Sequence, residues 1–232
     1  MLFERLGRPG LRGVAAAAVF AASLIACSGA DDASTGTPGP LVGLPAPRTA
    51  GLVTLEEALG QRRSARSFTP QSLTLEEISQ LLWAAQGITS SWGGRTAPSA
   101  GALYPLEVYV ADGARLSRYI PDGHQLEVGA EGDLRADLAH AAHDQTPVAE
   151  APAVFAITAV PSRTEIKYGD RALRYVYLEA GHAAQNLLLQ AAVLGLGGVP
   201  IGAFDDAEVA GLLHLPEGEV PIYLIPVGHP SD

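Results

Sequence analysis

Apolar side chains recur at helical spacing in several segments after residue 50. Thr54 and Thr74 each precede a glutamate by three residues, which is the capping-box pattern of a helix N-terminus. The first pattern predicts a short helix that ends near Gly60 or runs into the arginines that follow, and the second predicts an amphipathic helix that stops at Gly87. Further helices are expected at 133–143, at about 170–194 and at about 206–213.

Five other segments have the pattern of β-strands. Segment 106–111 alternates apolar and polar residues, and segment 153–160 is continuously apolar, as in a strand covered on both faces. Strands are also expected at 124–128, 198–204 and 220–227, the last with edge character at its ends because of its two prolines. Helices and strands follow no regular βαβ order and no internal repeat, so the predicted fold class is α+β.

The helix expected at about 170–194 is the longest in the chain. Its apolar stripe includes Leu178 and Leu188, and small residues at positions 180, 181, 183 and 184 would let another helix approach closely. Gly195 follows it as a C-cap. A helix of this length suits the core of a dimer.

The first 26 residues differ from the rest of the chain. Three arginines precede an uninterrupted run of apolar and small residues that ends at Cys27, the only cysteine. This pattern predicts a signal peptide over 1–26, and Leu24-Ile25-Ala26-Cys27 resembles a bacterial lipobox, in which the cysteine is acylated. The alternative is an ordinary signal peptide with an incidental cysteine. We therefore expect an exported lipoprotein, held at a membrane and facing the periplasm or the cell exterior.

The segment from Cys27 to residue 50 is rich in Gly, Pro, Ser, Thr and Ala, and is expected to be a flexible linker. Residues 51–232 are then the folded domain. The 232 residues are 47% hydrophobic, which suits one compact domain with an appendage. A formal net charge of −10 argues against nucleic acid as a partner, because phosphate backbones require a basic surface.

Arginine is concentrated in one short segment, RRSARSF, at 62–68. Arg62 and Arg66 are four residues apart with Ser64 between them and Arg63 beside them. Guanidinium groups and a hydroxyl so placed could converge on a phosphate. A solvated helix end is the equally weighted alternative. The six histidines include no HxxxH pair, so no metal site is expected, and there is no GxSxG or Walker motif.

Two glycine-containing segments accompany the arginines. PSAGALYPLEVYV at 98–110 leads from a turn into a strand, and GLGGVPIGAF at 195–204 follows the long helix. Small residues in such turns let a flat ring lie close to the backbone. Together with a phosphate clamp, these two surfaces fit flavin mononucleotide, FMN.

These segments, together with KYGDRALRYVYLEAGHAAQNLLLQA and the closing PVG, resemble the nitroreductase family, in particular its branch of azoline-oxidising dehydrogenases, which form thiazole and oxazole rings in peptides. The resemblance runs from about Leu55 to Gly228. It implies a central mixed β-sheet flanked by helices, with the long helix at the interface of a homodimer, and FMN as cofactor.

The resemblance also implies roles for individual residues. The arginine segment would hold the flavin phosphate, and the remaining contacts would lie near the ring: Pro98, Ser99, Ala100, Gly101, Gln185, Gly197, Gly198 and Gly202. Gln185 is equally well explained as part of a polar pair with Asn186. Ala102 and Tyr104 replace the Asn and Gln usual in the family's reductases, which favours the dehydrogenase branch.

Lys167 and Tyr168 coincide with a Lys-Tyr pair implicated in catalysis in the azoline-oxidising branch. A base close to an acid suits the removal of a ring proton with transfer of hydride to flavin N5. An ordinary surface lysine is the alternative. A C-terminal arm that many members carry is expected to be missing after Gly228, with His229, Arg63 or Arg95 as partial substitutes on the flavin phosphate.

Three functions remain open at this point. The first is an FMN-dependent oxidoreductase of the dehydrogenase type, acting on a small-molecule or peptide substrate. The second is an NAD(P)H-dependent reductase of quinones or nitro compounds. The third is a non-catalytic flavin-binding or scaffold lipoprotein.

Overall fold

The computed structural model describes residues 39–231. The predicted signal peptide, Cys27 and the first part of the predicted linker lie outside the described residues. Among residues 39–231, no helix is both long and apolar enough to cross a membrane.

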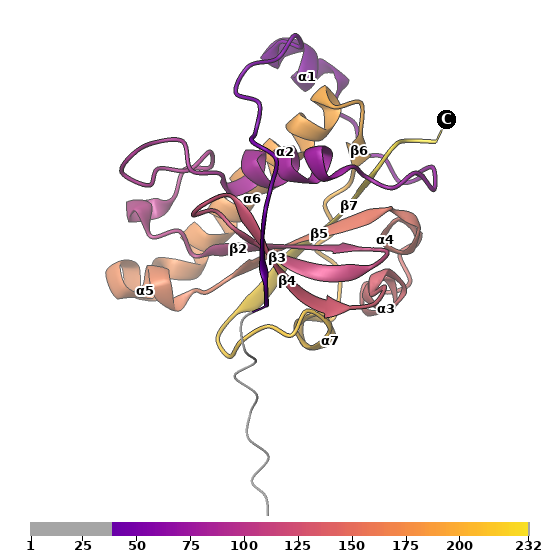
Figure 1. The fold of residues 1–232 in the computed structure, drawn as a ribbon. Helices are drawn as coiled ribbons and strands as arrows, with labels where there is room; N and C mark the ends of the chain where they lie inside the picture. Colours follow the sequence, from indigo (N-terminus) through magenta and orange to yellow (C-terminus); the bar gives the residue numbers. More distant parts are fainter. Residues whose placement is uncertain (1–38, 232) are drawn as a thin grey trace, which may run out of the picture. The chain divides into compact units, whose positions relative to one another are not determined.

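The described residues form one β-sheet with helices on both of its faces (Figure 1). The strands are β1 (Leu41–Gly43), β2 (Leu106–Asp112), β3 (Arg115–Ile120), β4 (Gln125–Glu131), β5 (Ala153–Ala159), β6 (Gly197–Gly198) and β7 (Val220–Gly228). The helices are α1 (Leu55–Gln61), α2 (Leu75–Gln86), α3 (Arg135–Ala141), α4 (Thr146–Glu150), α5 (Ser162–Tyr168), α6 (Ala172–Val193) and α7 (Asp206–Leu212), with 3₁₀ turns at Ala100–Ala102 (η1) and Gly169–Arg171 (η2).

The strand order is β1-β4-β3-β2-β5-β7-β6, and every pairing between these strands is antiparallel. The α+β class is confirmed, but the expected mixed sheet is antiparallel in its named strands. The one parallel pairing among the described residues is an isolated bridge between Ser64 and Gly198. Tight connections between β2, β3 and β4 account for the antiparallel order there, because consecutive strands joined by short turns run in opposite directions.

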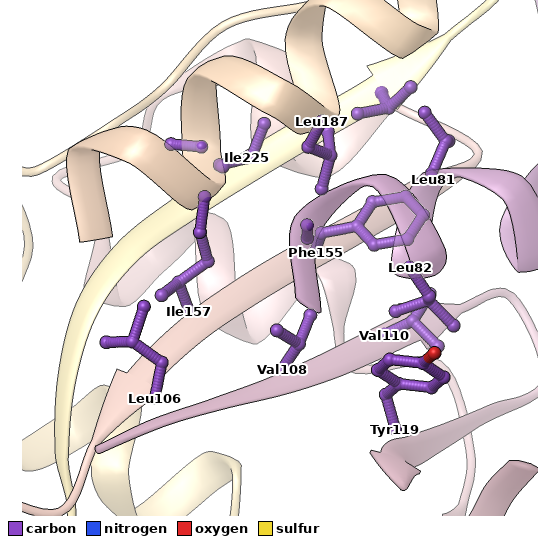
Figure 2. Packing of buried hydrophobic residues seen from close by; sticks show 14 of the residues in the cluster. Leu81, Leu82, Leu106, Val108, Val110, Tyr119, Phe155, Ile157, Leu187 and Ile225 are labelled. Carbon is purple, nitrogen blue, oxygen red and sulfur yellow. The ribbon is translucent and has the colours of Figure 1, made fainter. Parts of the chain in front are cut away.

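Alternating side chains of the central strands build two cores, one on each face of the sheet. On one face, α2 and α6 pack against Val108, Phe155 and Ile157, together with Leu187 of α6 (Figure 2). On the other face, Tyr109, Val154 and Ala156 pack with residues of α3, α4 and α7. Strand β5 is buried at every position, as its continuous apolar sequence predicts.

The structure confirms the two capping boxes predicted at the starts of α1 and α2. Thr54 and Thr74 each accept a hydrogen bond from the N3 amide, and the N3 glutamate accepts one from the cap amide. Helix α6 begins at Ala172 and ends at Val193, close to the expected bounds. Gly195 then takes φ +73°, the left-handed conformation that lets the chain reverse after the helix.

The folded region begins earlier than predicted. Within the expected linker, Leu41–Gly43 pairs with β4, and the carbonyl of Pro45 accepts a hydrogen bond from the Ser79 hydroxyl at 2.6 Å. The His124 ring nitrogen Nε2 lies 3.1 Å from the same carbonyl. The boundary at residue 50 is therefore wrong: these long-range contacts order a segment whose composition alone suggests a tether.

Three further elements are absent from the sequence-based prediction. Strand β3 carries two arginines and a buried Ser117, so its apolar alternation is weak. Helices α4 and α5 are short and have no side-chain N-cap, and Ile166 of α5 is 87% exposed. The expected strand 198–204 shrinks to Gly197–Gly198, with Ile201 in an isolated bridge to Leu224.

Candidate functional site

The arginine segment lies against β6. Ser64 bridges Gly198, and the amide of Ala65 donates to the carbonyl of Gly198 at 3.2 Å. A Cβ on Gly197 would come within 2.4 Å of the Ala65 Cβ, so only glycine permits this approach. The structure therefore brings together Arg62–Arg66 and Gly197–Gly198, and we call this group the arginine cluster.

The C-terminal residues extend the same contact. The amide of Thr69 donates to the carbonyl of His229 at 2.8 Å, and the amide of Ser231 donates to the carbonyl of Ser67 at 3.1 Å. The His229 imidazole, expected to assist the arginines, instead has its Nε2 3.9 Å from a carboxylate oxygen of Glu77. Its ring therefore faces α2.

The three arginines differ in their internal partners. Arg63 donates from Nη1 to the carbonyls of Gly60 and Arg62, at 2.9 and 2.8 Å, which satisfies the end of α1. Within the described part of the chain, Arg62 and Arg66 take part in no ion pair. Arg66 and the neighbouring Ser64 are exposed. Arg62, Ser64 and Arg66 are thus available to an anion, whereas Arg63 is engaged with backbone.

The Pro-Ser turn has an unusual backbone. Gly101, Ala102 and Tyr104 have φ of +66°, +55° and +47°, the left-handed region that non-glycine residues seldom adopt. Two hydrogen bonds to Ser99 hold this shape: its carbonyl accepts from the Ala102 amide at 3.1 Å, and its hydroxyl accepts from the Tyr104 amide at 2.9 Å. Strained turns of this kind persist only where their surroundings fix them.

Lys167 and Tyr168 lie beside this turn. A Cβ on Gly101 would be 3.1 Å from both Lys167 Nζ and Tyr168 Oη, so both side chains reach the backbone of the turn. Lys167 Nζ is 5.6 Å from the centroid of the Tyr168 ring, which in turn packs against the Tyr175 ring at 4.7 Å between centroids. We call Ser99–Tyr104 with Lys167 and Tyr168 the turn cluster.

Glu179 of α6 is a neighbour of this turn that the sequence analysis missed. It is 2% exposed, and its Oε1 has no hydrogen-bond partner among the described residues. Burial raises the pKa of Glu179 to about 7, while the Ser99 hydroxyl, Arg95 and the Ala100 amide act to lower it. The signal of burial that the sequence contains is the position of Glu179 within the apolar stripe of the helix, four residues before the buried Ala183.

Arg95 lies at the turn cluster and not at the arginine cluster. It donates from Nη1 to the Gln86 side chain at 2.8 Å, and its guanidinium lies 4.5 Å from the centroid of the Tyr104 ring. Burial lowers the pKa of Arg95, while Glu107 and Glu179 oppose this shift. The expectation that Arg95 assists the phosphate-binding arginines therefore does not fit its contacts.

The other predicted contacts are dispersed. Gln185 is exposed on α6, whereas Asn186 donates to the carbonyl of Thr96 at 3.2 Å, so the two do not form a polar pair with each other. Pro98 is exposed beside the turn cluster. Gly202 lies beyond β6, where a Cβ would have a Tyr223 ring carbon as its nearest neighbour at 3.7 Å, leaving room for a side chain.

Parts of the two clusters lie at opposite ends of α6. Lys167 and Tyr168 precede the N-terminus of α6, and Gly197 and Gly198 follow its C-terminus. The helix has 22 residues and so spans about 33 Å. Lys167 and Tyr168 therefore lie at the opposite end of this helix from Gly197 and Gly198.

No group of three or more potential metal ligands occurs among residues 39–231. His140 Nδ1, on α3, lies 3.1 Å from Asp144 Oδ1, in the turn that follows, and both side chains are exposed.

Comparison with known proteins identifies the family. The nitroreductase family profile matches residues 59–229. A candidate nitroreductase of Methanocaldococcus jannaschii is 44% identical over 184 residues, which cover 76% of this chain and 91% of that protein. The chain belongs to the nitroreductase family.

Solved structures agree with this assignment. The crystal structure of a candidate nitroreductase from Ralstonia eutropha has a TM-score of 0.75 at 32% identity, covering 86% of this chain and 97% of the other. A structure of an NADPH:FMN oxidoreductase from Vibrio harveyi in complex with NAD⁺ has a TM-score of 0.57 at 25% identity, covering 77% of this chain and 69% of the other.

The buried carboxyl of Glu179 predicts a pH-dependent stability. Its pKa in the folded chain, about 7, lies above the ordinary value of 4.5. The folded state therefore holds more protons between these values, and the free energy of unfolding falls as pH rises through them. We expect Glu179→Gln to be more stable than the parent at about pH 8, by about 2 kcal/mol, and similar at about pH 4.5.

Urea unfolding at the two pH values measures this difference. Glu150→Gln, which removes an exposed carboxylate from α4, is the control and should leave the pH dependence unchanged. A Glu179→Gln protein that is less stable than the parent at the higher pH would contradict the assignment of a desolvated carboxyl.

Proposed function

We propose that this member of the nitroreductase family is an FMN-dependent oxidoreductase of the dehydrogenase type, which oxidises an azoline-like ring in a small molecule or peptide. The single observation that carries the cofactor assignment is the arginine cluster. Among the described residues, Arg62 and Arg66 have no carboxylate partner, and the Ser64 hydroxyl is exposed between them. This donor set fits the phosphate of FMN. When bound, FMN supplies the ring that accepts hydride.

The dehydrogenase type is supported by the position of Lys167 and Tyr168. Both side chains reach the backbone of Gly101, in the turn that the family resemblance assigns to the flavin ring. Lys167 is the residue proposed to take a proton from a substrate ring, and the Tyr168 hydroxyl beside it can donate a hydrogen bond to a substrate heteroatom. Lys167 is exposed, which leaves room beside it for a peptide or a small molecule.

A reductase that draws electrons from NAD(P)H is the second candidate. It is favoured by the similarity to the NADPH:FMN oxidoreductase of Vibrio harveyi, whose structure contains NAD⁺. The two candidates share the cofactor and differ in the source of hydride.

A homodimer would unite the two clusters. In a two-fold dimer that pairs the α6 helices antiparallel, the C-terminal end of one helix lies beside the N-terminal end of the other. The arginine cluster of one protomer would then face the turn cluster of its partner, twice per dimer. The positions of the two clusters relative to α6, a helix about 33 Å long, support this assembly.

The surface of α6 suits such a partner. Leu173, Tyr177 and Leu178 are 46%, 57% and 53% exposed, which is unusual for large apolar side chains on one helix. Leu55 and Leu59 of α1 are exposed as well, and a groove of about 260 Å³ between α1, α2 and α6 is lined mostly by apolar side chains. A second copy of the chain would cover this surface.

We also propose that the domain is held at a membrane through a lipid on Cys27. The support is the lipobox-like sequence before this cysteine and the apolar run that precedes it. Membrane fractionation of cells that express the full chain or Cys27→Ser tests the anchor: a cysteine-independent distribution would refute it.

Neutralising the arginine cluster is expected to weaken flavin binding. The double variant Arg62→Ala/Arg66→Ala removes two charge-assisted contacts, each worth about 1.5–3 kcal/mol, and should weaken FMN affinity about 100-fold or more. Quenching of FMN fluorescence on titration measures this. Arg63→Ala is the matched neighbour and should lose less, because Arg63 already binds backbone carbonyls. Unchanged affinity in the double variant would refute the FMN site.

The source of hydride separates the two candidate activities. With the FMN-loaded protein under anaerobic conditions, an azoline-containing peptide is expected to bleach the visible absorbance of the flavin at the turnover rate, whereas NADPH and NADH bleach it slowly. Lys167→Ala should slow the azoline reaction by about 100-fold or more and leave FMN affinity unchanged. Rapid bleaching by NAD(P)H alone would favour the reductase.

Complementation tests whether each site is shared between protomers. Arg62→Ala/Arg66→Ala and Lys167→Ala should each be inactive as homodimers. In a mixed dimer, the arginines of the second variant face the lysine of the first, so one of the two sites is intact. Co-expression in equal amounts should restore about a quarter of the parent activity, because about half of the dimers are mixed. A site contained in one chain would show no recovery.

A further inference from the structure

Tyr104, at the end of the left-handed turn, is held by three separate groups. Its amide donates to the Ser99 hydroxyl at 2.9 Å, and the Arg95 guanidinium lies 4.5 Å from the centroid of its ring. Its carbonyl accepts a hydrogen bond from Nη1 of Arg163 at 3.1 Å. Tyr104 has φ +47°, and a non-glycine residue keeps such a backbone only where its surroundings fix it. The contact with Arg163 is the one that connects the turn to α5.

The guanidinium of Arg163 makes two contacts at once. While Nη1 binds the Tyr104 carbonyl, Nη2 lies 2.6 Å from a carboxylate oxygen of Glu107, on β2. The Glu107 side chain is 11% exposed, and its other oxygen lies 3.8 Å from Arg118, so this carboxylate is itself held in place. The planar fork of an arginine binds two acceptors in one fixed geometry. Arg163 therefore ties α5 both to the turn and to the sheet.

Helix α5 has few other means of attachment. Thr164 is its one buried residue, and the large apolar side chain of Ile166 is 87% exposed. The helix has seven residues and no side-chain N-cap, and a helix this short is not stable in water without tertiary contacts. Its C-terminal end is held by the packing of the Tyr168 ring on the Tyr175 ring of α6. Arg163 holds its N-terminal end.

The candidate catalytic pair depends on where α5 lies. Lys167 follows Arg163 by four residues, so the two lie one turn apart on the same side of the helix. Lys167 Nζ and the Tyr168 hydroxyl lie beside the Gly101 backbone, where a Cβ would be 3.1 Å from each. A shift of α5 relative to the turn would move both groups away from this backbone.

We propose that Arg163 is the positioning residue of the turn cluster: its guanidinium bridges the Tyr104 carbonyl and the Glu107 carboxylate, and so fixes α5 against the turn. In this way it holds Lys167 and Tyr168 in place. The catalytic part of this inference rests on the proposed oxidoreductase site. The structural part, a helix fixed against the turn by one arginine, concerns only residues of this chain.

Hydrogen exchange of the Gly169 amide tests the structural part without cofactor or substrate. This amide donates to the carbonyl of Glu165 at the end of α5, so its protection reports whether the helix is formed. Arg163→Ala should lower the protection factor about tenfold, because charge-assisted contacts are lost while alanine itself favours the helix. Amide-resolved exchange by NMR on the parent chain and the variant gives the measurement.

Two further variants separate the bridge from the mere loss of an arginine. Arg163→Lys keeps a charge that can pair with Glu107 and should lose only about threefold in protection. Arg118→Ala removes the other arginine near Glu107, whose second partner is Glu127 at 2.7 Å, and should leave the Gly169 amide unchanged. Parent-like protection in Arg163→Ala, an unprotected amide in the parent, or an equal loss in Arg118→Ala would overturn the proposal.

The split between kcat and KM tests the catalytic part. With the FMN-loaded protein and an azoline-containing peptide, Arg163→Ala should lower kcat about tenfold, because Lys167 is no longer held at the turn. KM and FMN affinity should stay within about twofold of the parent values. Arg163→Lys should recover part of kcat, and Arg118→Ala should keep all of it. A rise in KM at unchanged kcat would refute the positioning role.

These measurements separate this inference from the proposed function. If the parent does not oxidise the peptide, the proposed function is refuted and the catalytic role of Arg163 with it, whereas a loss of Gly169 protection in Arg163→Ala still supports the bridge. If the parent oxidises the peptide and Arg163→Ala retains the parent kcat, the function stands and the positioning role is refuted.

Discussion

The packing of α6 across one face of the sheet is the constraint on which the rest of the structure depends. Its buried residues, among them Val176, Ala180 and Leu187, join the core formed by β2, β5 and β7. Because the helix is rigid and about 33 Å long, whatever is attached to its two ends is held apart. Gly197 and Gly198 of the arginine cluster follow one end of this helix, and Lys167 and Tyr168 of the turn cluster precede the other.

The core of the domain and its candidate site impose opposite requirements on α6. Most of its inward positions carry alanine, valine or leucine, which pack closely and leave no polar group unsatisfied. Glu179 interrupts this pattern with a carboxyl that is costly to bury. Natural proteins tolerate such costs mainly at functional sites. Glu179 is a neighbour of Ser99 and Ala100 in the left-handed turn, so this cost falls at the candidate site.

Much of the fold follows from local patterns in the sequence. Threonine with glutamate three residues on marks the starts of α1 and α2, and the apolar stripe with Gly195 marks α6. The juxtaposition of the arginine segment with Gly197–Gly198 agrees with the family resemblance. Local patterns fail where the partner is distant. Strand β1 has three exposed residues in a Pro- and Gly-rich segment and exists because β4, some 80 residues later, offers an edge. Burial raises the pKa of Glu179, and the groups that oppose this shift, Ser99 and Arg95, are about 80 positions away, where no local pattern contains them.

Strand β1 also determines how the domain is attached to the chain before it. Residues 41–43 pair antiparallel with Gln125–Glu127. Just beyond them, the Pro45 carbonyl accepts a hydrogen bond from Ser79 and contacts the His124 ring. A pulling force from the N-terminal side would therefore act first on the few hydrogen bonds between β1 and β4 at the edge of the sheet. It would act next on the contacts of Pro45 with α2 and the 121–124 turn. A further contact couples this segment to α6: the Arg48 backbone bonds to the Gln80 side chain, which in turn donates to Gln190.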